Sequence, residues 1–286
     1  MKDDSLRKPD WLKIRLGGND RFTRTKHIVE SHGLHTICSS GRCPNAGECW
    51  SRGTATFLIG GDICTRSCRF CNTPTGKPLP LNLQEPAAVA ESIRLMGLAH
   101  AVITSVDRDD LPDLGTAHWV ETIRAIKEQN PQTTLEVLVP DFQGRLDLLD
   151  LIIAVSPEII SHNMETVRRL TPSVRSAARY DVSLSVLRHI SANHITAKTG
   201  IMAGLGETEA EVYALMDDAL QAGVSVLTIG QYLRPSRAAL PVCEYITPRR
   251  FETYREAALQ KGFKVVESAP LVRSSYHAEK HVNGSI

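Results

Sequence analysis

The segment TATFLIGGDICTRSCRFC, residues 54–71, places three cysteines directly after a short run rich in β-branched residues. The run at 54–60 predicts a strand, and Cys64, Cys68 and Cys71 follow in the loop GGDICTRSCRFCNTPTGKP. A second cysteine group, CSSGRCPNAGEC, lies just upstream at residues 38–49. The two groups together hold six of the seven cysteines, and only Cys243 stands apart.

From residue 54 onward, strand patterns alternate with amphipathic helical patterns. The strand patterns lie at 54–60, 99–106, 133–139, 157–162, 197–203 and 224–230. Helical spacing of apolar residues follows each of them, at 85–97, 117–129, 145–155, 179–191, 207–223 and 248–262. Thr208 and Glu211 add a capping-box pattern at the start of the fifth helix.

Six β-α units predict an α/β fold with parallel strands and right-handed crossovers. Six are too few for a complete eight-stranded barrel, so we expect an open, partial (β/α)6 barrel. Chemistry in such folds gathers at the carboxyl ends of the strands, where the loop with Cys64 lies. Residues 54–263 would form the barrel, with an N-terminal extension at 1–53 and a C-terminal extension at 264–286.

Length and composition exclude several classes of protein. The chain has 286 residues, 42% of them hydrophobic, as expected for one enzyme domain. Its charged N-terminus of mixed sign predicts a cytoplasmic location, and no run approaches the roughly 18 apolar residues that would span a bilayer. A net charge of +1 gives no sign of a nucleic-acid partner.

The first thirty residues are locally basic, which favours either a solvated surface or a docking face for an acidic protein. The cations there are Lys2, Arg7, Lys8, Lys13, Arg15, Arg21, Arg24 and Lys26.

Clustered cysteines in a cytoplasmic chain favour metal binding over disulfides. A structural zinc site takes four protein ligands, so one mixed zinc site would leave two of the six thiols unused. A cubane iron–sulfur cluster also takes four ligands, but an incomplete set leaves one iron open. Two clusters with three cysteines each would use all six.

The spacing C-x3-C-x2-C at Cys64, Cys68 and Cys71 resembles the motif of the radical S-adenosylmethionine (SAM) superfamily. The resemblance implies a [4Fe–4S] cluster whose open iron chelates SAM, which one electron then cleaves to a 5′-deoxyadenosyl radical. Phe70 matches the aromatic position that lies against the adenine, and Gly204 in TGIMAGLGE matches the segment that approaches the adenosine. Taken alone, Gly204 and Gly206 suggest a dinucleotide loop, but the third glycine of that motif is missing.

The upstream spacing C-x4-C-x5-C at Cys38, Cys43 and Cys49, together with the radical SAM loop, resembles the lipoyl synthases. Further matching segments span nearly the whole chain: KPDWLKIRL, TSVDRDDLPD, HNMET, GIMAGLGET, QYLRPS and RSSYHAE. The resemblance implies that sulfur is inserted at carbons 6 and 8 of a protein-bound octanoyl group. It also implies that a second [4Fe–4S] cluster donates the sulfur and takes a tail serine as its fourth ligand. That serine would be Ser274, with Ser275 as the alternative.

Polar residues at other strand ends are candidate SAM contacts. Ser105 follows the second strand pattern, and Asn163 and Glu165 follow the fourth. Their position and the family resemblance both place them near the cofactor. His162, beside them, is expected to be a hydrogen-bonded structural histidine. The segment TSVDRDDLPD, although charged enough for a surface turn, is expected at the site.

The resemblance also implies partners: an octanoylated carrier domain (2-oxoacid dehydrogenase E2 or glycine cleavage H protein), a low-potential electron donor (flavodoxin or ferredoxin) and an iron–sulfur carrier that rebuilds the sacrificed cluster.

Two alternative functions would use the cysteines differently. A zinc or iron–sulfur binding module would act as a scaffold or electron carrier without SAM chemistry. A biotin-type sulfur insertion would leave the upstream cysteines and the RSSY segment without a role.

Overall fold

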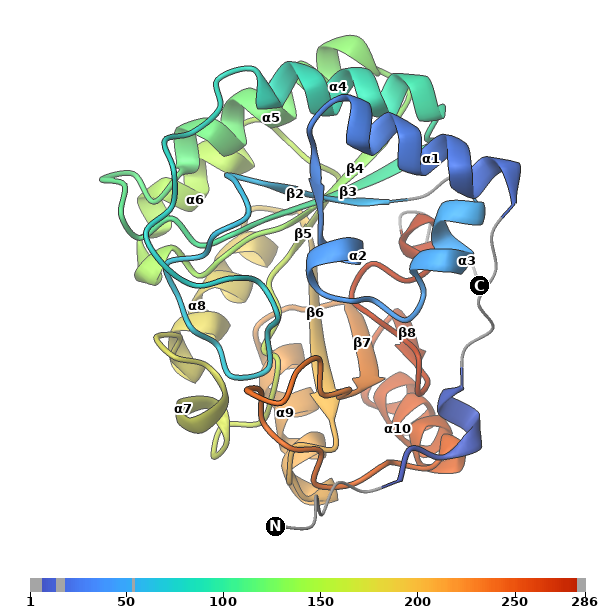
Figure 1. The fold of residues 1–286 in the computed structure, drawn as a ribbon. Helices are drawn as coiled ribbons and strands as arrows, with labels where there is room; N and C mark the ends of the chain where they lie inside the picture. Colours follow the sequence, from blue (N-terminus) through green and yellow to red (C-terminus); the bar gives the residue numbers. More distant parts are fainter. Residues whose placement is uncertain (1–6, 14–18, 53–54, 282–286) are drawn as a thin grey trace.

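Seven parallel strands form a curved, open sheet whose outer side is covered by helices (Figure 1). The computed structural model describes residues 7–13, 19–52 and 55–281. Two basic residues of the N-terminal stretch, Lys2 and Arg15, lie outside these ranges, as does the expected boundary at residues 53 and 54. Among the described residues, no helix is both long and apolar enough to cross a bilayer.

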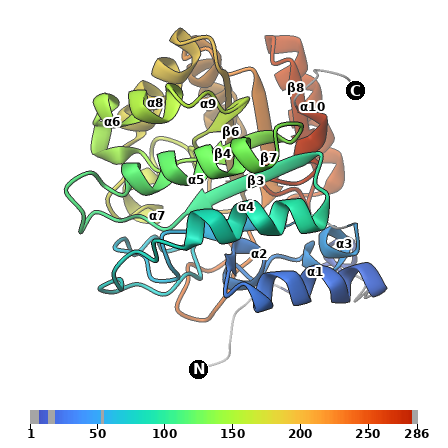
Figure 2. The same ribbon diagram turned by 90° about the horizontal axis from the view of Figure 1, so that it is seen from above.

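The strands follow one another around the sheet in chain order, β1 to β8. They are β1 (His35–Thr36), β2 (Thr56–Ile59), β3 (His100–Ser105), β4 (Thr134–Leu138), β5 (Ile159–Ser161), β6 (Thr196–Ala203), β7 (Val226–Gln231) and β8 (Val265–Ser268). Only the β1–β2 pair is antiparallel. Figure 2 shows the stack of crossover helices from above. The helices are α1 (Asp20–Ser31), α2 (Ile37–Ser40), α3 (Ala46–Ser51), α4 (Glu85–Met96), α5 (Thr116–Gln129), α6 (Leu146–Ile153), α7 (Thr171–Val174), α8 (Tyr180–Ala192), α9 (Glu209–Gln221) and α10 (Pro248–Lys261), with short 3-10 turns η1 (Asp10–Leu12), η2 (Phe142–Gly144) and η3 (Ala278–Lys280).

All six predicted β-α units are confirmed. Each predicted strand overlaps one of β2 to β7, and each predicted helix overlaps α4, α5, α6, α8, α9 or α10. Strands buried on both faces read as nearly continuous apolar runs, which explains why β2 and β7 stand out in the sequence. The capping box also forms, because the Thr208 side chain accepts from the Glu211 amide while the Glu211 carboxylate accepts from the Thr208 amide.

The strand β8 is not predicted by the alternating pattern, which assigns residues 264–286 to an extension outside the repeats. This assignment is wrong for Val265–Ser268, which pair in parallel with β7. The strand has four residues, and no α-helix follows it within the described part of the chain, so β8 does not begin a seventh complete β-α unit there. The strand β1 has only two residues, so an alternation of apolar and polar residues cannot reveal it either.

The N- and C-terminal extensions meet on the open side of the sheet, between β2 and β8. Asn45 donates from its amide to the carbonyl of Leu271 at 2.7 Å. The Thr56 hydroxyl, at the start of β2, donates to Ser275 Oγ at 2.8 Å. Figure 1 shows the blue helices α2 and α3 beside the red C-terminal segment. The tail therefore covers the gap that an eighth parallel strand fills in a closed barrel.

A buried ion pair occupies the inner face of the sheet, below the cavity described next. Lys198 and Glu136 are both fully buried, and the Lys198 ammonium lies 2.7 and 2.8 Å from the two carboxylate oxygens. Ser161 donates to the same carboxylate at 2.8 Å, and His281 Nδ1 lies 3.0 Å from Lys198 Nζ. The pair satisfies the hydrogen-bonding needs that burial imposes on each charge. Through His281 it also ties the end of the described tail to the barrel interior.

Candidate active site

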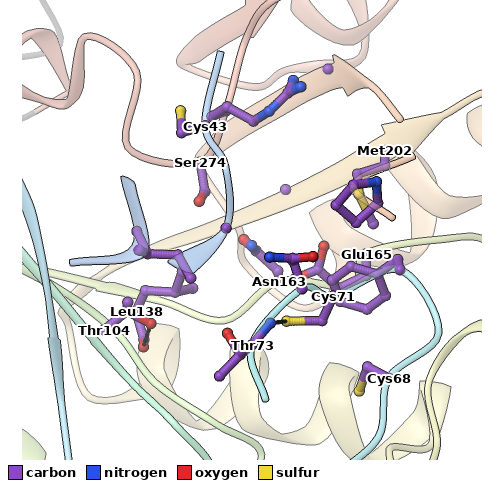
Figure 3. A pocket seen from close by; sticks show the side chains of 18 of the residues that line it. Cys43, Cys68, Cys71, Thr73, Thr104, Leu138, Asn163, Glu165, Met202 and Ser274 are labelled. Carbon is purple, nitrogen blue, oxygen red and sulfur yellow. Dashed lines mark hydrogen bonds between the residues drawn. The ribbon is translucent and has the colours of Figure 1, made fainter. Parts of the chain in front are cut away.

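A cavity of about 620 Å³ opens at the carboxyl ends of the strands. Residues of β2, β3, β4, β6 and β7 line it, together with both terminal extensions. Figure 3 shows Cys43 and Ser274 at one end of this cavity and Cys68 and Cys71 at the other. The cysteine loop and Cys43 of the upstream group, which are separated in sequence and in the fold, thus face one shared space.

The loop that carries Cys64, Cys68 and Cys71 is held by backbone hydrogen bonds on both sides. The Cys64 amide donates to the Pro74 carbonyl at 2.8 Å, and the Arg69 amide donates to the Val174 carbonyl at 2.9 Å. All three thiols are free and partly exposed to the cavity. Burial, reinforced by the Asp107 carboxylate, raises the pKa of Cys64 to about 12. The thiol therefore keeps its proton until a metal displaces it.

Arg66 anchors this loop from within. Its guanidinium forms a two-pronged contact with Asp109, at 2.7 and 2.9 Å, and lies 2.8 Å from Asp141 and 3.3 Å from Asp107. Burial opposes the charge of Arg66, but the hydrogen bond to Asp109 and the charges of all three aspartates outweigh it and raise the pKa of the guanidinium. The aspartates come from the strand-end loops after β3 and β4. The segment TSVDRDDLPD, expected at the site, is therefore adjacent to the cysteine loop.

Replacing Arg66 with methionine is expected to unfold or loosen the cysteine loop. The variant would leave buried carboxylates without a cation, which costs about 3–5 kcal/mol when one partner of a buried ion pair is removed. Urea unfolding of the purified chain and its iron content measure the two effects. Arg69→Met in the same loop is the matched control, because Arg69 is exposed and has no ion pair among the described residues. Equal stability and iron content in the two variants would contradict this role of Arg66.

The candidate SAM contacts Ser105, Asn163, Glu165 and Phe70 all line the cavity. Ser105 Oγ and Asn163 Oδ1 are buried and have no hydrogen-bond partner within the described part of the chain. Buried polar atoms normally find a partner, so these two atoms fit a polar ligand. Asn163 can approach the sheet only because Gly200 has no side chain, since a Cβ there would lie 2.9 Å from Asn163 Oδ1.

Glu165 sits in the left-handed region, with φ at +64°, while its backbone bridges to β6. Burial raises the pKa of its carboxyl, against the opposing charge of Arg175 and a hydrogen bond from Asn163. Phe70 packs with Val174, Leu205 and Tyr232 at the cavity wall. The side chain of Phe70 is therefore held by apolar contacts while it also lines the cavity.

Two more residues singled out in the sequence are His162, which lines the cavity, and Gly204, which does not. His162 is confirmed as a structural histidine, because its ring nitrogens lie 2.9 Å from the Val139 carbonyl and 2.9 Å from Ser183 Oγ. Gly204 lies just after β6, but outside the cavity lining. With φ at +101°, its Cα faces the Gln231 side chain and the Glu244 carbonyl, each 2.3 Å from where a Cβ would stand. The conformation explains the glycine, and its contact with adenosine stays a prediction.

The upstream cysteines lie in and between two short helices. Cys38 belongs to α2, Cys43 follows it, and Cys49 belongs to α3. A small apolar cluster holds this region, in which Cys38 and Trp50 are buried and Cys43 and Cys49 pack against them. Thr36 is the N-cap residue of α2, and its hydroxyl accepts a hydrogen bond from the Ser39 amide.

The tail segment RSSY lies directly against these cysteines. Tyr276 donates to the Glu48 carboxylate beside Cys49, and the Arg273 guanidinium faces Cys43. Burial lowers the pKa of Arg273, and Cys43 acts in the opposite direction. Ser274 lines the cavity, whereas Ser275 Oγ is occupied by the hydrogen bond from Thr56. Of the two serines, Ser274 is therefore the one that lines the cavity at the same end as Cys43 (Figure 3).

Both cysteine groups suit a cubane cluster in their donor chemistry, since each group has three soft sulfur ligands and forms no disulfide within the described ranges. No group of three or more His, Cys, Asp or Glu side chains in the described ranges is gathered around the position of a single ion. A cubane binds its ligands through separate irons at its corners, so its cysteines stand further apart than the ligands of one ion. The lack of a single-ion site in the described ranges is therefore compatible with a cluster at each triplet.

Comparisons with known proteins match this geometry. Residues 58–219 match the family model described as the radical SAM superfamily. The chain is 78% identical to a lipoyl synthase of Parabacteroides distasonis over 97% of its own length and 99% of the relative's. It is 67% identical to a lipoyl synthase of Bacteroides thetaiotaomicron, with 98% and 99% of the two chains covered.

The chain belongs to the lipoyl synthase family. This membership confirms the radical SAM chemistry expected from the cysteine loop, the sulfur-inserting class of enzyme, and SAM and [4Fe–4S] clusters as cofactors. Solved structures support the fold alone. Methylornithine synthase has a TM-score of 0.57 at 12% identity, covering 85% of this chain and 81% of its own. Streptococcus suis SuiB bound to S-adenosylmethionine has a TM-score of 0.59 at 9% identity, covering 79% and 55%.

The residues that anchor the lipoyl synthase site were only partly visible in the sequence. Asp109 belongs to the segment TSVDRDDLPD expected at the site, but no spacing motif joins it with Arg66 and Asp141, so nothing in the pattern marks the three residues as a unit. One usable signal exists, because Asp107, Asp109 and Asp141 all follow predicted parallel strands, whose carboxyl ends meet at one edge of the sheet.

Proposed function

We propose that Cys64, Cys68 and Cys71 hold the cluster that cleaves SAM, and that Cys38, Cys43 and Cys49 with Ser274 hold the sulfur-donating cluster. The chain would insert two sulfur atoms at carbons 6 and 8 of an octanoyl group bound to a lysine of a lipoyl carrier domain. The observation that supports this proposal most directly is the single cavity lined by Cys43 and Ser274 at one end and by the other triplet at its opposite end.

The cavity wall between the two ends suits an acyl chain. Leu58, Leu138, Val139 and Ile201 line it. Burial of an alkyl chain against such side chains contributes about 0.8 kcal/mol per methylene. The apolar wall would also exclude water from a reactive carbon radical and hold carbons 6 and 8 between the two cysteine groups.

Other residues would position SAM. Phe70 would lie against the adenine, Ser105 and Asn163 would offer their unpartnered oxygens, and Glu165 would offer a carboxyl from the same side. Gly204 would act through its backbone near the adenosine. When bound, the cluster supplies the electron that cleaves SAM and so yields a radical able to remove hydrogen from an unactivated carbon. No side-chain base can deprotonate such a carbon, because its acidity is far too low.

The partners follow from this chemistry. The carrier would be the E2 component of a 2-oxoacid dehydrogenase or the glycine cleavage H protein. A flavodoxin or ferredoxin would supply electrons, and an iron–sulfur carrier would rebuild the consumed cluster. We place the reaction in the cytoplasm, since the seven cysteines, all in the described part of the chain, form no disulfide there.

Anaerobic incubation with SAM, reductant and an octanoylated carrier peptide tests the function. The peptide is expected to gain two sulfur atoms and, after oxidation, lose two hydrogens, as read by mass spectrometry. Before turnover, two cubanes predict about eight iron and eight sulfide per chain. A colourless, zinc-containing protein that leaves the peptide unchanged would establish a binding module in place of the enzyme.

A further inference from the structure

The cavity reaches the surface through a rim that carries several cations. Lys8, Arg42 and Arg234 are exposed and also line the cavity, so they mark its mouth. Three more exposed cations lie nearby. Arg7 and Arg237 are on the same segments, and Arg69 is on the cysteine loop, next to the cavity-lining Phe70. We refer to the six as the mouth cations: Arg7, Lys8, Arg42, Arg69, Arg234 and Arg237.

Several cations on the outer helices have carboxylate partners. On the outer side, Arg94 lies 2.6 Å from Glu91, Arg169 lies 2.7 Å from Glu211, and Lys261 is paired with Asp217. Within residues 7–13, 19–52 and 55–281, none of the mouth cations forms an ion pair. The chain as a whole has a net charge of only +1. This rim of unpaired cations favours a positive potential around the cavity mouth.

Three of the four segments that carry these cations are fixed to one another, namely those of Arg42, Arg69 and Arg234. Arg42 donates to the Pro235 carbonyl at 3.2 Å, and Arg234 donates to the Ala239 carbonyl at 3.0 Å. The Leu240 amide donates to the Arg69 carbonyl at 3.0 Å, which ties the same loop to the cysteine loop. These three segments thus have set positions around the opening before any partner arrives.

We propose that the mouth cations form the docking surface for an acidic face of the carrier domain. This inference rests on the proposed function, because an acyl chain tethered to a carrier lysine can enter the cavity only if the carrier lies over its mouth. Six exposed cations on four segments exceed what the single carboxylate of SAM requires. Charge complementarity of this kind accelerates encounter and fixes orientation more than it adds raw affinity.

The test compares an octanoyl group carried by the whole carrier domain with one carried by a short peptide. Arg7 and Arg237 lie outside the cavity lining, and their side chains make no hydrogen bond within the described ranges, so R7E/R237E changes charge alone. We expect KM for an octanoylated carrier domain to rise about fivefold to tenfold at low salt, and Kd measured by calorimetry to rise in parallel. Turnover of a short neutral octanoyl-lysyl peptide should be unchanged. Added salt should reduce the difference, because exposed charges are screened.

The matched control is R188E/K264E, which changes net charge equally. Arg188 lies near the end of α8 and Lys264 just before β8, at the opposite end of the barrel, and both are exposed. Equal carrier affinity in the two variants would overturn the proposal, as would an equal loss with the short peptide. Binding of an RNA oligonucleotide that disappears in R7E/R237E, with carrier affinity retained, would overturn it in favour of another partner. If wild type fails to convert the peptide, the proposed function fails, while calorimetry still decides the docking.

Discussion

Replacement of Cys68 with alanine is expected to abolish reductive cleavage of SAM without unfolding the chain. Loss of one of three thiolate ligands should lower cleavage at least about 100-fold, since even partners that only hydrogen-bond to metal ligands cost 10–100-fold. The surrounding loop does not depend on this side chain, because Cys68 Sγ lies near Ser176 Oγ at 3.9 Å while backbone bonds and Arg66 hold the loop. Anaerobic assay of 5′-deoxyadenosine by chromatography measures the effect.

The iron content of the Cys68→Ala variant separates this explanation from a general loss of structure. It should fall from about eight to about four per chain, because the other triplet keeps its ligands. Cys243→Ala is the matched control, since Cys243 is exposed and belongs to neither triplet. It should leave iron content and SAM cleavage unchanged. Retained production of 5′-deoxyadenosine in Cys68→Ala would remove this triplet from its assigned role.

The repeating part of the fold was predictable because its signal is local. Strands β2 to β7 are buried and followed by amphipathic helices, so each unit shows its own change of hydrophobic period. The strand β8 has four residues, one of them only half-buried, and up to residue 281 no α-helix follows it to complete the pattern. The path of the tail between β8 and β2 depends on contacts such as Thr56 with Ser275, which join residues 219 positions apart. No local pattern encodes such a contact.

The candidate active site, like the fold, was predictable from the sequence only in part. Cysteine spacing identifies the two triplets, because cluster ligands must lie at short intervals within one loop or across two short helices. The contacts of Arg66 with three aspartates depend on the neighbouring order of β3 and β4, which spacing does not reveal. The sequence also left Ser274 and Ser275 as alternatives, since adjacent residues share the same motif. Their side chains differ only in three dimensions, where one faces the cavity and the other is bonded to Thr56.

That difference makes the Ser274→Ala variant a sharp test of the sulfur-donating site. SAM cleavage should continue, because Cys64, Cys68 and Cys71 are untouched. Formation of the lipoyl product should fall at least about 100-fold, the upper range of effects seen when partners of metal ligands are removed. A serine oxygen is a harder ligand than thiolate, so it suits an iron that must be released when sulfide is donated. Mass spectrometry of the carrier peptide and assay of 5′-deoxyadenosine in the same reaction measure the two outcomes.

Ser275→Ala provides the matched control one residue away. It removes the acceptor of the Thr56 hydrogen bond at 2.8 Å, so it should cost about 1 kcal/mol of stability and little activity. The Ser274→Cys variant tests the same role of residue 274 in another way. A thiolate should hold the iron more tightly than the serine oxygen, so this variant should keep its iron content while forming the lipoyl product more slowly. If Ser275→Ala suppressed lipoyl formation and Ser274→Ala did not, the ligand would be Ser275, and the tail would have to rotate and give up its bond to Thr56 when the cluster binds.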